Sequence, residues 1–245
     1  MYFPSLLILV LTLALARLLE ADTRILAAVR QCPPTVGGGK VISASCNASS
    51  SMPRAPSTFF THGGGPMPLL GQDPKLAEFL AAWPGSLAEV PAALVIISAH
   101  WEEREVSVAS GESPSLIFDY GGFPDESYKY KYDAPGHPAL AEKIGALISE
   151  AGLGDARMRD DRGWDHGVFV PMMLTFPAAK VPIVVVSLVS GYDPAVHWQL
   201  GRALRPLRDE GVAIIGSGSS CEWFAAPAVC MSLCTLTAAL QAGHC

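Results

Sequence analysis

Three histidines in the middle of the chain have positions that suit metal binding and proton transfer. His62 and His100 each directly follow a short β-prone run, Ser57–Thr61 and Ala93–Ala99, and His166 stands just before a predicted helix. Ligands of open α/β sheets bind beyond the carboxyl ends of the strands, so two such strands would bring both imidazoles to one edge. Imidazole is a common metal ligand and an acid or base near neutral pH. The pattern predicts a metal site at His62 and His100. Histidines that merely cap a strand or helix are the alternative.

The other histidines are weaker candidates. His137 lies in a turn between prolines and is predicted to be solvated, His197 lies one turn into a predicted helix and is predicted to be on the surface, and His244 is next to the last residue. Gly63–Gly65, directly after His62, would let the backbone approach a ligand closely, because glycine has no Cβ to clash. An ordinary flexible turn is the alternative for these glycines.

Two further motifs are less specific. Gly216–Ser220 follows a predicted strand and resembles a dinucleotide-binding loop, but Cys221 replaces the third glycine of that fingerprint. We therefore interpret it as a turn that brings the backbone near the site. The aromatic-rich stretch Tyr120–Tyr132 is either ordinary loop packing or a lid that stacks on an aromatic substrate.

Apolar runs alternate with amphipathic segments from Ser57 onward, which predicts an α/β fold with a mostly parallel central sheet covered by helices on both faces. Asp193 is a plausible N-cap, and Gly152 is a typical helix stop. The third strand is expected near an edge of the sheet. The predicted strands are 57–61, 93–99, 105–109, 181–188 and 211–215, and the predicted helices are 75–82, 138–151, 168–176 and 194–208.

The composition fits one α/β domain with a substantial core, since half of the 245 residues are hydrophobic. The net charge of −6, without a cluster of Lys and Arg, argues against a nucleic-acid partner. Cysteine is absent between Ala48 and Ser220, so the fold is not expected to depend on disulfides. Cys230 and Cys234 lie one helical turn apart and could bind zinc with His244, although buried thiols on a helix face are commoner.

The two ends of the chain differ from the middle. Met1–Ala16 has no charged side chain and is too short for a membrane span, which favours a secretory or organellar targeting segment over a cytoplasmic start. Gln31–Pro56 is rich in Ser, Gly and Pro and is typical of a linker. We divide the chain into a targeting and linker segment (1–56), an α/β domain (57–220) and an atypical tail (221–245) that could form a terminal helix on the sheet.

Four groups of residues occur in an order that resembles a known family. They are Thr61-His-Gly-Gly-Gly-Pro66, Ser98-Ala-His-Trp101, Tyr120-Gly-Gly-Phe-Pro124 with Lys131-Tyr-Asp-Ala-Pro-Gly136, and Arg162-Gly-Trp-Asp-His-Gly167 with Val170-Pro171. Between Ser57 and Ser219 the chain resembles the class III extradiol ring-cleavage dioxygenases, in the branch similar to DOPA-4,5-dioxygenase.

The resemblance implies an enzyme that opens the ring of a catechol such as DOPA with O2. His62 and His100 would hold Fe(II) or Zn(II), and His166 would be the acid or base beside the metal. Tyr128 and Tyr132 would contact the substrate from the aromatic loop. No stable membrane span is expected after processing.

The tail departs from the family pattern, which includes a third metal ligand from the C-terminal part and a His-Asn segment where Ser220–Trp223 stands here. Cys221, Glu222 or His244 could substitute, the chain could be a truncated or alternatively spliced form or carry a mispredicted gene end, or it could be an inactive homologue. Two histidines alone would hold a metal weakly. A zinc hydrolase that uses His166 as general base is a further alternative, weakened by the lack of an H-E-x-x-H motif.

Overall fold

The computed structural model describes residues 54–218 and 227–241. The predicted targeting segment, most of the linker and the residues at 221, 222 and 244 therefore lie outside the described part. Within that part, no helix combines the length and the hydropathy needed to cross a membrane.

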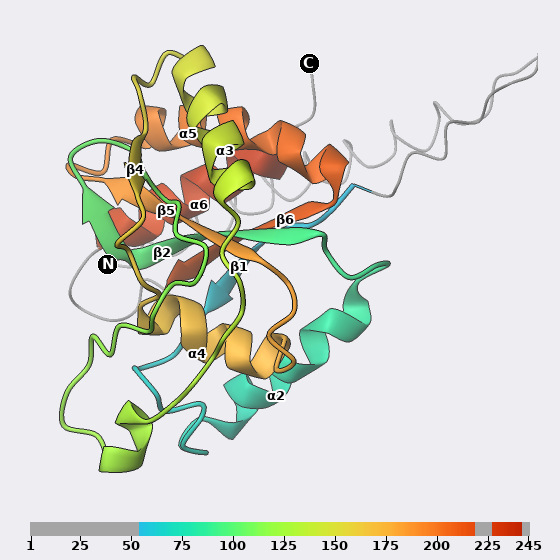
Figure 1. Cartoon of the computed structure of the whole chain (residues 1–245), viewed down its shortest axis with the longest axis vertical. Coiled ribbons are helices and arrows are strands. Elements are labelled where there is room, and N and C mark those ends of the chain that lie inside the picture. The colour runs from blue at the N-terminus through green and yellow to red at the C-terminus, as the bar shows by residue number, and fades with distance from the viewer. Residues whose placement is uncertain (1–53, 219–226, 242–245) are drawn as a thin grey trace, which may run out of the picture. The chain divides into compact units, whose positions relative to one another are not determined.

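A six-stranded sheet forms the centre of the domain, between two layers of helices (Figure 1). The strand order is β1-β6-β2-β5-β3-β4. The first four strands in this order run parallel to their neighbours, β3 is antiparallel to β5, and β4 is parallel to β3. The prediction of a mostly parallel central sheet is therefore confirmed. The strands are β1 (Ser57–Thr61), β2 (Ala93–Glu103), β3 (Ser107–Ala109), β4 (Arg157–Arg159), β5 (Ile183–Val189) and β6 (Val212–Gly218).

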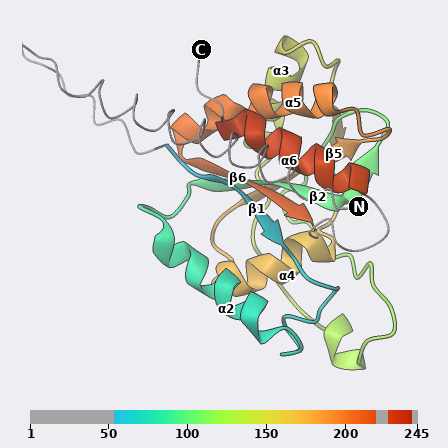
Figure 2. The same ribbon diagram turned by 180° about the vertical axis from the view of Figure 1, so that it is seen from behind.

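Helices cover both faces of this sheet, as Figures 1 and 2 show from opposite sides. One face carries α2 (Pro74–Ala82) and α4 (His166–Thr175), and the other carries α3 (Pro138–Glu150), α5 (Pro194–Leu204) and α6 (Pro227–Gln241). Three short 3-10 helices, at Trp83–Ser86, Asp125–Tyr128 and Arg205–Glu210, complete the regular structure of the described residues. The α/β architecture with two covered faces agrees with the sequence.

The core has two layers, one on each side of the sheet, because successive side chains of a strand point to opposite faces. In β2, Val95 and Ile97 pack in the layer with α3, α5 and α6, whereas Leu94 and Ile96 pack in the layer with α2 and α4. All four side chains are fully buried. Burial on both faces explains why this strand is a continuous apolar run in the sequence.

Side-chain caps fix where three of the helices begin. Asp73 and Asp193 accept hydrogen bonds from backbone N–H groups in the first turns of α2 and α5, and each helix starts with proline. His137 caps α3 in the same way by accepting from the Leu140 N–H, and it is half-buried. Its predicted place in a solvated turn therefore needs correction.

His197 is fully buried, so its predicted position on the surface is wrong. Its Nδ1 lies 2.8 Å from the Asp193 carbonyl oxygen, and its Nε2 accepts a hydrogen bond of 3.2 Å from the Val189 N–H. The imidazole thereby satisfies the backbone at the end of β5. Helical periodicity carries no information about that partner, which lies on another element.

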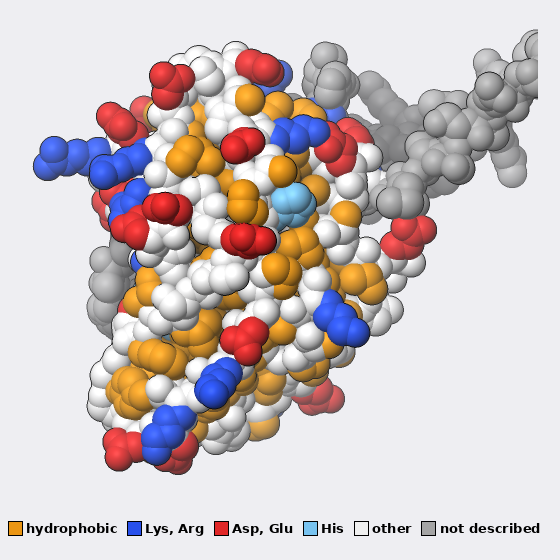
Figure 3. Space-filling model, in the orientation of Figure 1, with side chains coloured by type: hydrophobic (Ala, Val, Ile, Leu, Met, Phe, Trp, Pro, Cys, Tyr) orange, Lys and Arg blue, Asp and Glu red, His pale blue; other side chains and the backbone are white. Residues whose placement is uncertain are grey.

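Several element boundaries differ from the predictions, and two of the differences matter for the site. β2 continues four residues beyond Ala99 to Glu103, so His100 lies within the strand. α4 begins two residues before Val168, so His166 is its first residue. β3 lies near an edge of the sheet, as predicted, and the edge strand beside it is β4, which is absent from the predictions. On the face seen in Figure 3, basic and acidic side chains are intermixed.

Candidate metal centre

His62 is the first residue after β1, and only 2% of it is exposed. Its Nδ1 lies 2.8 Å from the hydroxyl of Ser217, on the neighbouring strand β6. Because the Ser217 hydroxyl donates its own proton to the Gly167 carbonyl, the His62 Nδ1 must be the donor. Burial, followed by the charges of His100 and His166, holds the pKa of His62 well below its usual value. His62 is therefore neutral, with the lone pair on Nε2.

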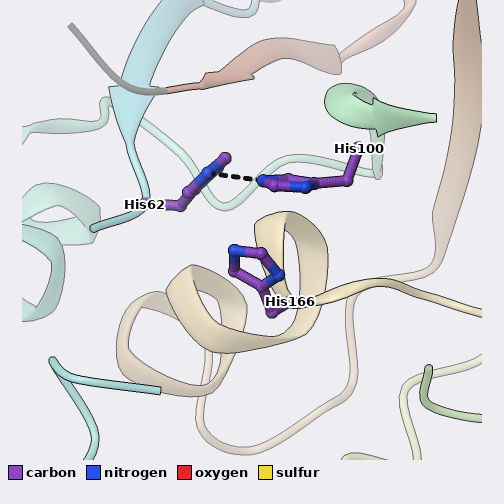
Figure 4. A group of neighbouring side chains, drawn as sticks. All are labelled: His62, His100 and His166. Carbon is purple, nitrogen blue, oxygen red and sulfur yellow. Dashed lines mark hydrogen bonds between the residues drawn. The ribbon is translucent and has the colours of Figure 1, made fainter. Parts of the chain in front are cut away.

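His100 stands where the pairing of β2 with β5 shifts its register, between Ile97 and Glu102. Such irregularities often re-aim a side chain next to a functional site. The His100 Nε2 lies 3.1 Å from the Nε2 of His62 (Figure 4). Burial and the charge of His166 lower the pKa of His100, although about a third of its side chain, 34%, is exposed. Among the three histidines, His100 is the one that solvent or a ligand can reach.

His166 completes the histidine cluster, by which we mean His62, His100 and His166. The ring centroid of His166 lies 4.0 Å from that of His100 and 5.1 Å from that of His62. Figure 4 shows His62 beside β1, His100 on β2 and His166 on α4, with the three rings turned toward a shared space. One nitrogen from each ring lies within 4.8 Å of the others. Residues from three distant parts of the sequence thus converge. For His62 and His100, which follow two strands, the sequence predicts this convergence.

The cluster fits a transition-metal ion of the iron or zinc type. Nitrogens that share an ion at bonds of about 2.1 Å lie about 3 to 3.4 Å apart. The 3.1 Å between the Nε2 atoms of His62 and His100 falls in that range. Neutral imidazole is also the form that binds a metal. The alternative third ligands named from the sequence, Cys221, Glu222 and His244, all lie outside the residues that the structure describes.

Asp119 joins the site, and the sequence predictions do not include it. Its Oδ1 accepts hydrogen bonds of 2.9 Å from both the backbone N–H and the Nδ1 of His166, and its Oδ2 lies 3.5 Å from the Nδ1 of His100. Burial alone would raise the pKa of Asp119, but the hydrogen bonds from His166 outweigh it and lower the pKa to about 2. The carboxylate is therefore ionised and can only accept hydrogen bonds.

A second carboxylate, which is buried, ties the segments of the site together. Asp165, which is 1% exposed, accepts a hydrogen bond of 2.7 Å from the Ser98 hydroxyl and pairs with the Arg162 guanidinium. The Ser98 hydroxyl also accepts from the backbone N–H of His100. A Cβ on Gly167 would lie 2.8 Å from the Ser98 Oγ and 3.0 Å from the His62 Nδ1, so only glycine fits there. This packing explains the Arg162–Gly167 motif.

Aromatic side chains form a wall beside His166. The ring of Tyr120 lies 5.9 Å from that of His166, and Tyr128 packs 5.3 Å from Tyr120. Gly65 packs against this wall, since a Cβ there would come within 3.1 Å of the Phe123 ring and the residue has a positive φ of +58°. The glycine run is thus more than a flexible turn, because it lets the loop after β1 approach the aromatic loop.

The two tyrosines expected to contact a substrate occupy different surroundings. Tyr128 belongs to the wall and its hydroxyl accepts from the Phe123 N–H. Tyr132 is 5% exposed, and its hydroxyl donates to the carbonyl of Phe176. This burial favours a role for Tyr132 in the core, and substrate contact by either tyrosine stays a prediction.

The glycine–serine motif after the last predicted strand and Cys234 of the C-terminal helix can both be located in the structure. Gly216–Gly218 lies within β6 and is not a turn, so that interpretation is wrong, although Ser217 does reach the site. A Cβ on Gly218 would come within 2.8 Å of the Leu233 side chain, so glycine allows α6 to pack on the sheet. Cys234 is exposed on α6, and His244, its proposed partner in a zinc site, lies outside the described residues.

The chain belongs to the family described as the catalytic LigB subunit of aromatic ring-opening dioxygenase, whose model matches residues 58–228. The resemblance to class III extradiol dioxygenases is thereby confirmed. The chain is 43% identical to the dioxygenase tasH of Hapsidospora irregularis over 70% of its length. It is 42% identical over 66% to a 4,5-DOPA dioxygenase extradiol of Beta vulgaris, and 36% identical over 69% to one of Escherichia coli. It spans 55%, 61% and 60% of these three relatives, respectively.

Proposed function

We propose that this protein is a non-haem, metal-dependent extradiol dioxygenase that opens the ring of a catechol with O2. The observation that carries the proposal is the histidine cluster itself, in which three imidazoles from β1, β2 and α4 offer nitrogens within 4.8 Å of one another. The membership of the chain in a family of ring-opening dioxygenases supports the same reaction.

DOPA is the first substrate to test. Relatives in Beta vulgaris and Escherichia coli are named as 4,5-DOPA dioxygenases, which supports a catechol with an amino-acid side chain. The aromatic wall beside His166 offers ring faces against which a planar diol could stack, since aromatic pairs favour offset or edge-to-face contact.

His62 and His100 would hold the metal, either Fe(II) or Zn(II), through their Nε2 atoms. When bound, the ion supplies Lewis acidity and, as Fe(II), a path for electrons from the catechol to O2. Both oxygen atoms of O2 enter the ring-opened product, so the reaction needs no outside reductant. The partial exposure of His100 marks the side from which the two reactants would reach the site.

His166 would move the protons of the reaction. Its Nδ1 donates to Asp119, so in the neutral ring the Nε2 carries a lone pair. That nitrogen is suited to take a proton from a catechol hydroxyl and to return one as the ring opens. Because His166 is also one of the three histidines whose nitrogens could hold a metal ion, it could act as a ligand instead. The separation of these two roles is tested by mutation below.

A direct assay tests the function. The purified chain is loaded without air with Fe(II) or, separately, with Zn(II), then given DOPA and O2. We expect oxygen uptake in a one-to-one ratio with a yellow, strongly absorbing ring-opened product from the iron form. A protein that keeps its metal but consumes no oxygen with DOPA or simpler catechols would contradict the proposal and favour an inactive homologue.

A further inference from the structure

Asp119 faces two members of the histidine cluster at once. We propose that Asp119 is a positioning residue that keeps a proton on the Nδ1 of both His100 and His166, so that both rings present Nε2 to the shared space. This inference rests on the proposed function, because it assigns the shared space to a metal and a substrate. None of the family motifs identified in the sequence contains Asp119.

The contact with His166 fixes that ring. The Asp119 Oδ1 receives the backbone N–H and the Nδ1 of His166, both at 2.9 Å. An ionised carboxylate has no proton to donate, so the imidazole must carry hydrogen on Nδ1. A neutral imidazole has one N–H, and the Nε2 is therefore left as an acceptor. Metal-binding and catalytic histidines are commonly oriented by a carboxylate on the other nitrogen.

The second oxygen acts on His100. The Asp119 Oδ2 lies 3.5 Å from the His100 Nδ1, so its negative charge favours hydrogen at that nitrogen. On the other side of the ring, the His100 Nε2 meets the Nε2 of His62, which carries a lone pair because Ser217 receives its Nδ1–H. A neutral His100 has a single N–H and cannot serve both neighbours. A cation in the shared space removes this conflict, because it accepts both lone pairs while Nδ1–H stays toward Asp119.

The backbone places Asp119 where it can act on both rings. The Trp164 N–H donates to the Ser115 carbonyl at 2.8 Å, and the Ile117 N–H donates to the Trp164 carbonyl at 2.7 Å. A Cβ on Gly163 would lie 2.3 Å from the Ser115 carbonyl oxygen, so glycine permits this close pairing. The segment that carries Asp119 is thus held beside the segment that leads into His166.

The variant Asp119→Asn separates positioning from a structural role. Asparagine has nearly the same shape, and its carbonyl oxygen can still accept both hydrogen bonds from His166. Its amide group would face the His100 Nδ1 as a donor, which favours hydrogen on the His100 Nε2 and blocks that nitrogen from a metal. A residue that only filled space or capped α4 would tolerate this change.

The first measurement is the affinity for Zn²⁺, determined by competition with a chelator on the full chain. We expect Asp119→Asn to weaken binding about 10- to 100-fold, as is typical when a carboxylate behind a metal-binding histidine is lost. Asp209→Asn is the matched control. Asp209 pairs with Arg54 at 2.6 Å. These two residues precede β6 and β1, which run parallel, so the pair lies at the opposite end of the two strands from the site. Asp209→Asn should therefore leave the Zn²⁺ affinity unchanged. Equal affinity in wild type and Asp119→Asn would overturn the proposal.

A second measurement needs no variant. Nitrogen-15 NMR of the Zn²⁺-loaded wild type, with labelled histidine, should show hydrogen on Nδ1 in both His100 and His166. Hydrogen on Nε2 of His166 would overturn the proposal even if Asp119→Asn failed to fold. Neither measurement depends on ring cleavage. A protein whose Zn²⁺ affinity depends on Asp119 but which opens no catechol would therefore refute the proposed function and leave the role of Asp119 standing.

Discussion

The buried imidazole of His197 and the imidazoles of the histidine cluster use their ring nitrogens differently. His197, between α5 and β5, has a backbone partner for each ring nitrogen, Asp193 on one side and Val189 on the other. In the histidine cluster, Ser217 and Asp119 engage only the Nδ1 side, and the Nε2 atoms of His62 and His100 face each other at 3.1 Å. The Nε2 atoms of His62 and His100 thus meet in one space, where a cation could accept the lone pairs of both.

The largest effect should come from removing a metal ligand. In His62→Ala the cluster loses its most buried ring and the Nε2 lone pair that Ser217 fixes. We expect Zn²⁺ or Fe(II) affinity to fall by more than about 100-fold, beyond what the loss of an outer partner costs, and oxygen uptake with DOPA to disappear. Equilibrium dialysis with metal analysis checks the first effect, and an oxygen electrode checks the second.

His137→Ala is the control for that variant. It also removes an imidazole, but one that caps α3 by accepting from the Leu140 N–H. Loss of an N-cap costs about 1 kcal/mol of stability and should not change metal affinity. If His62→Ala and His137→Ala lost metal affinity to the same degree, metal binding could not be assigned to the histidine cluster in preference to the other histidines.

A smaller effect on metal and a large effect on turnover are expected at His166. His166→Ala should retain metal within a few-fold of wild type, because His62 and His100 remain, while kcat falls about 10²- to 10⁴-fold through loss of the acid–base group. Metal content and kcat are measured on the same preparation. Loss of the metal in parallel with kcat would show that His166 is a ligand and that the acid–base role belongs elsewhere.

The parts of the site that the sequence predicts are those attached to regular elements. His62 and His100 follow apolar strands, and the carboxyl ends of parallel strands meet at one edge, so their convergence could be expected. His166 could be placed just ahead of a helix because the apolar stretch 168–176 follows it. Asp119 could not, because it lies in an irregular stretch without periodicity, 47 residues before His166. Its role depends on the backbone pairing between Ile117 and Trp164, which no side-chain pattern records.

The fold shows the same division. The buried strands β2, β5 and β6 and the helices α2, α3 and α5 have the apolar runs, proline starts and caps that predict them. β4 is Arg157–Arg159, in which two arginines flank an exposed methionine, so its sequence carries no strand signal, and only its pairing with β3 defines it. The position of His197 one turn into a helix predicts a surface side chain, whereas its ring is buried against a backbone N–H at the end of β5. Contacts with the backbone of another element are invisible in a linear pattern.

The smallest effect on metal binding should come from His197, although its effect on stability is larger. His197→Ala leaves the Val189 N–H and the Asp193 carbonyl buried without their partner, which costs about 1 to 3 kcal/mol. Thermal unfolding of the metal-free chain should therefore occur several degrees lower, whereas Zn²⁺ affinity measured well below that temperature should match wild type. His197→Gln should recover part of the stability, because its amide can donate to the carbonyl and accept from the N–H. If a folded His197→Ala lost Zn²⁺ affinity, this imidazole would also support the metal site. The distinction between His197, whose two ring nitrogens both have backbone partners, and the histidine cluster would then be wrong.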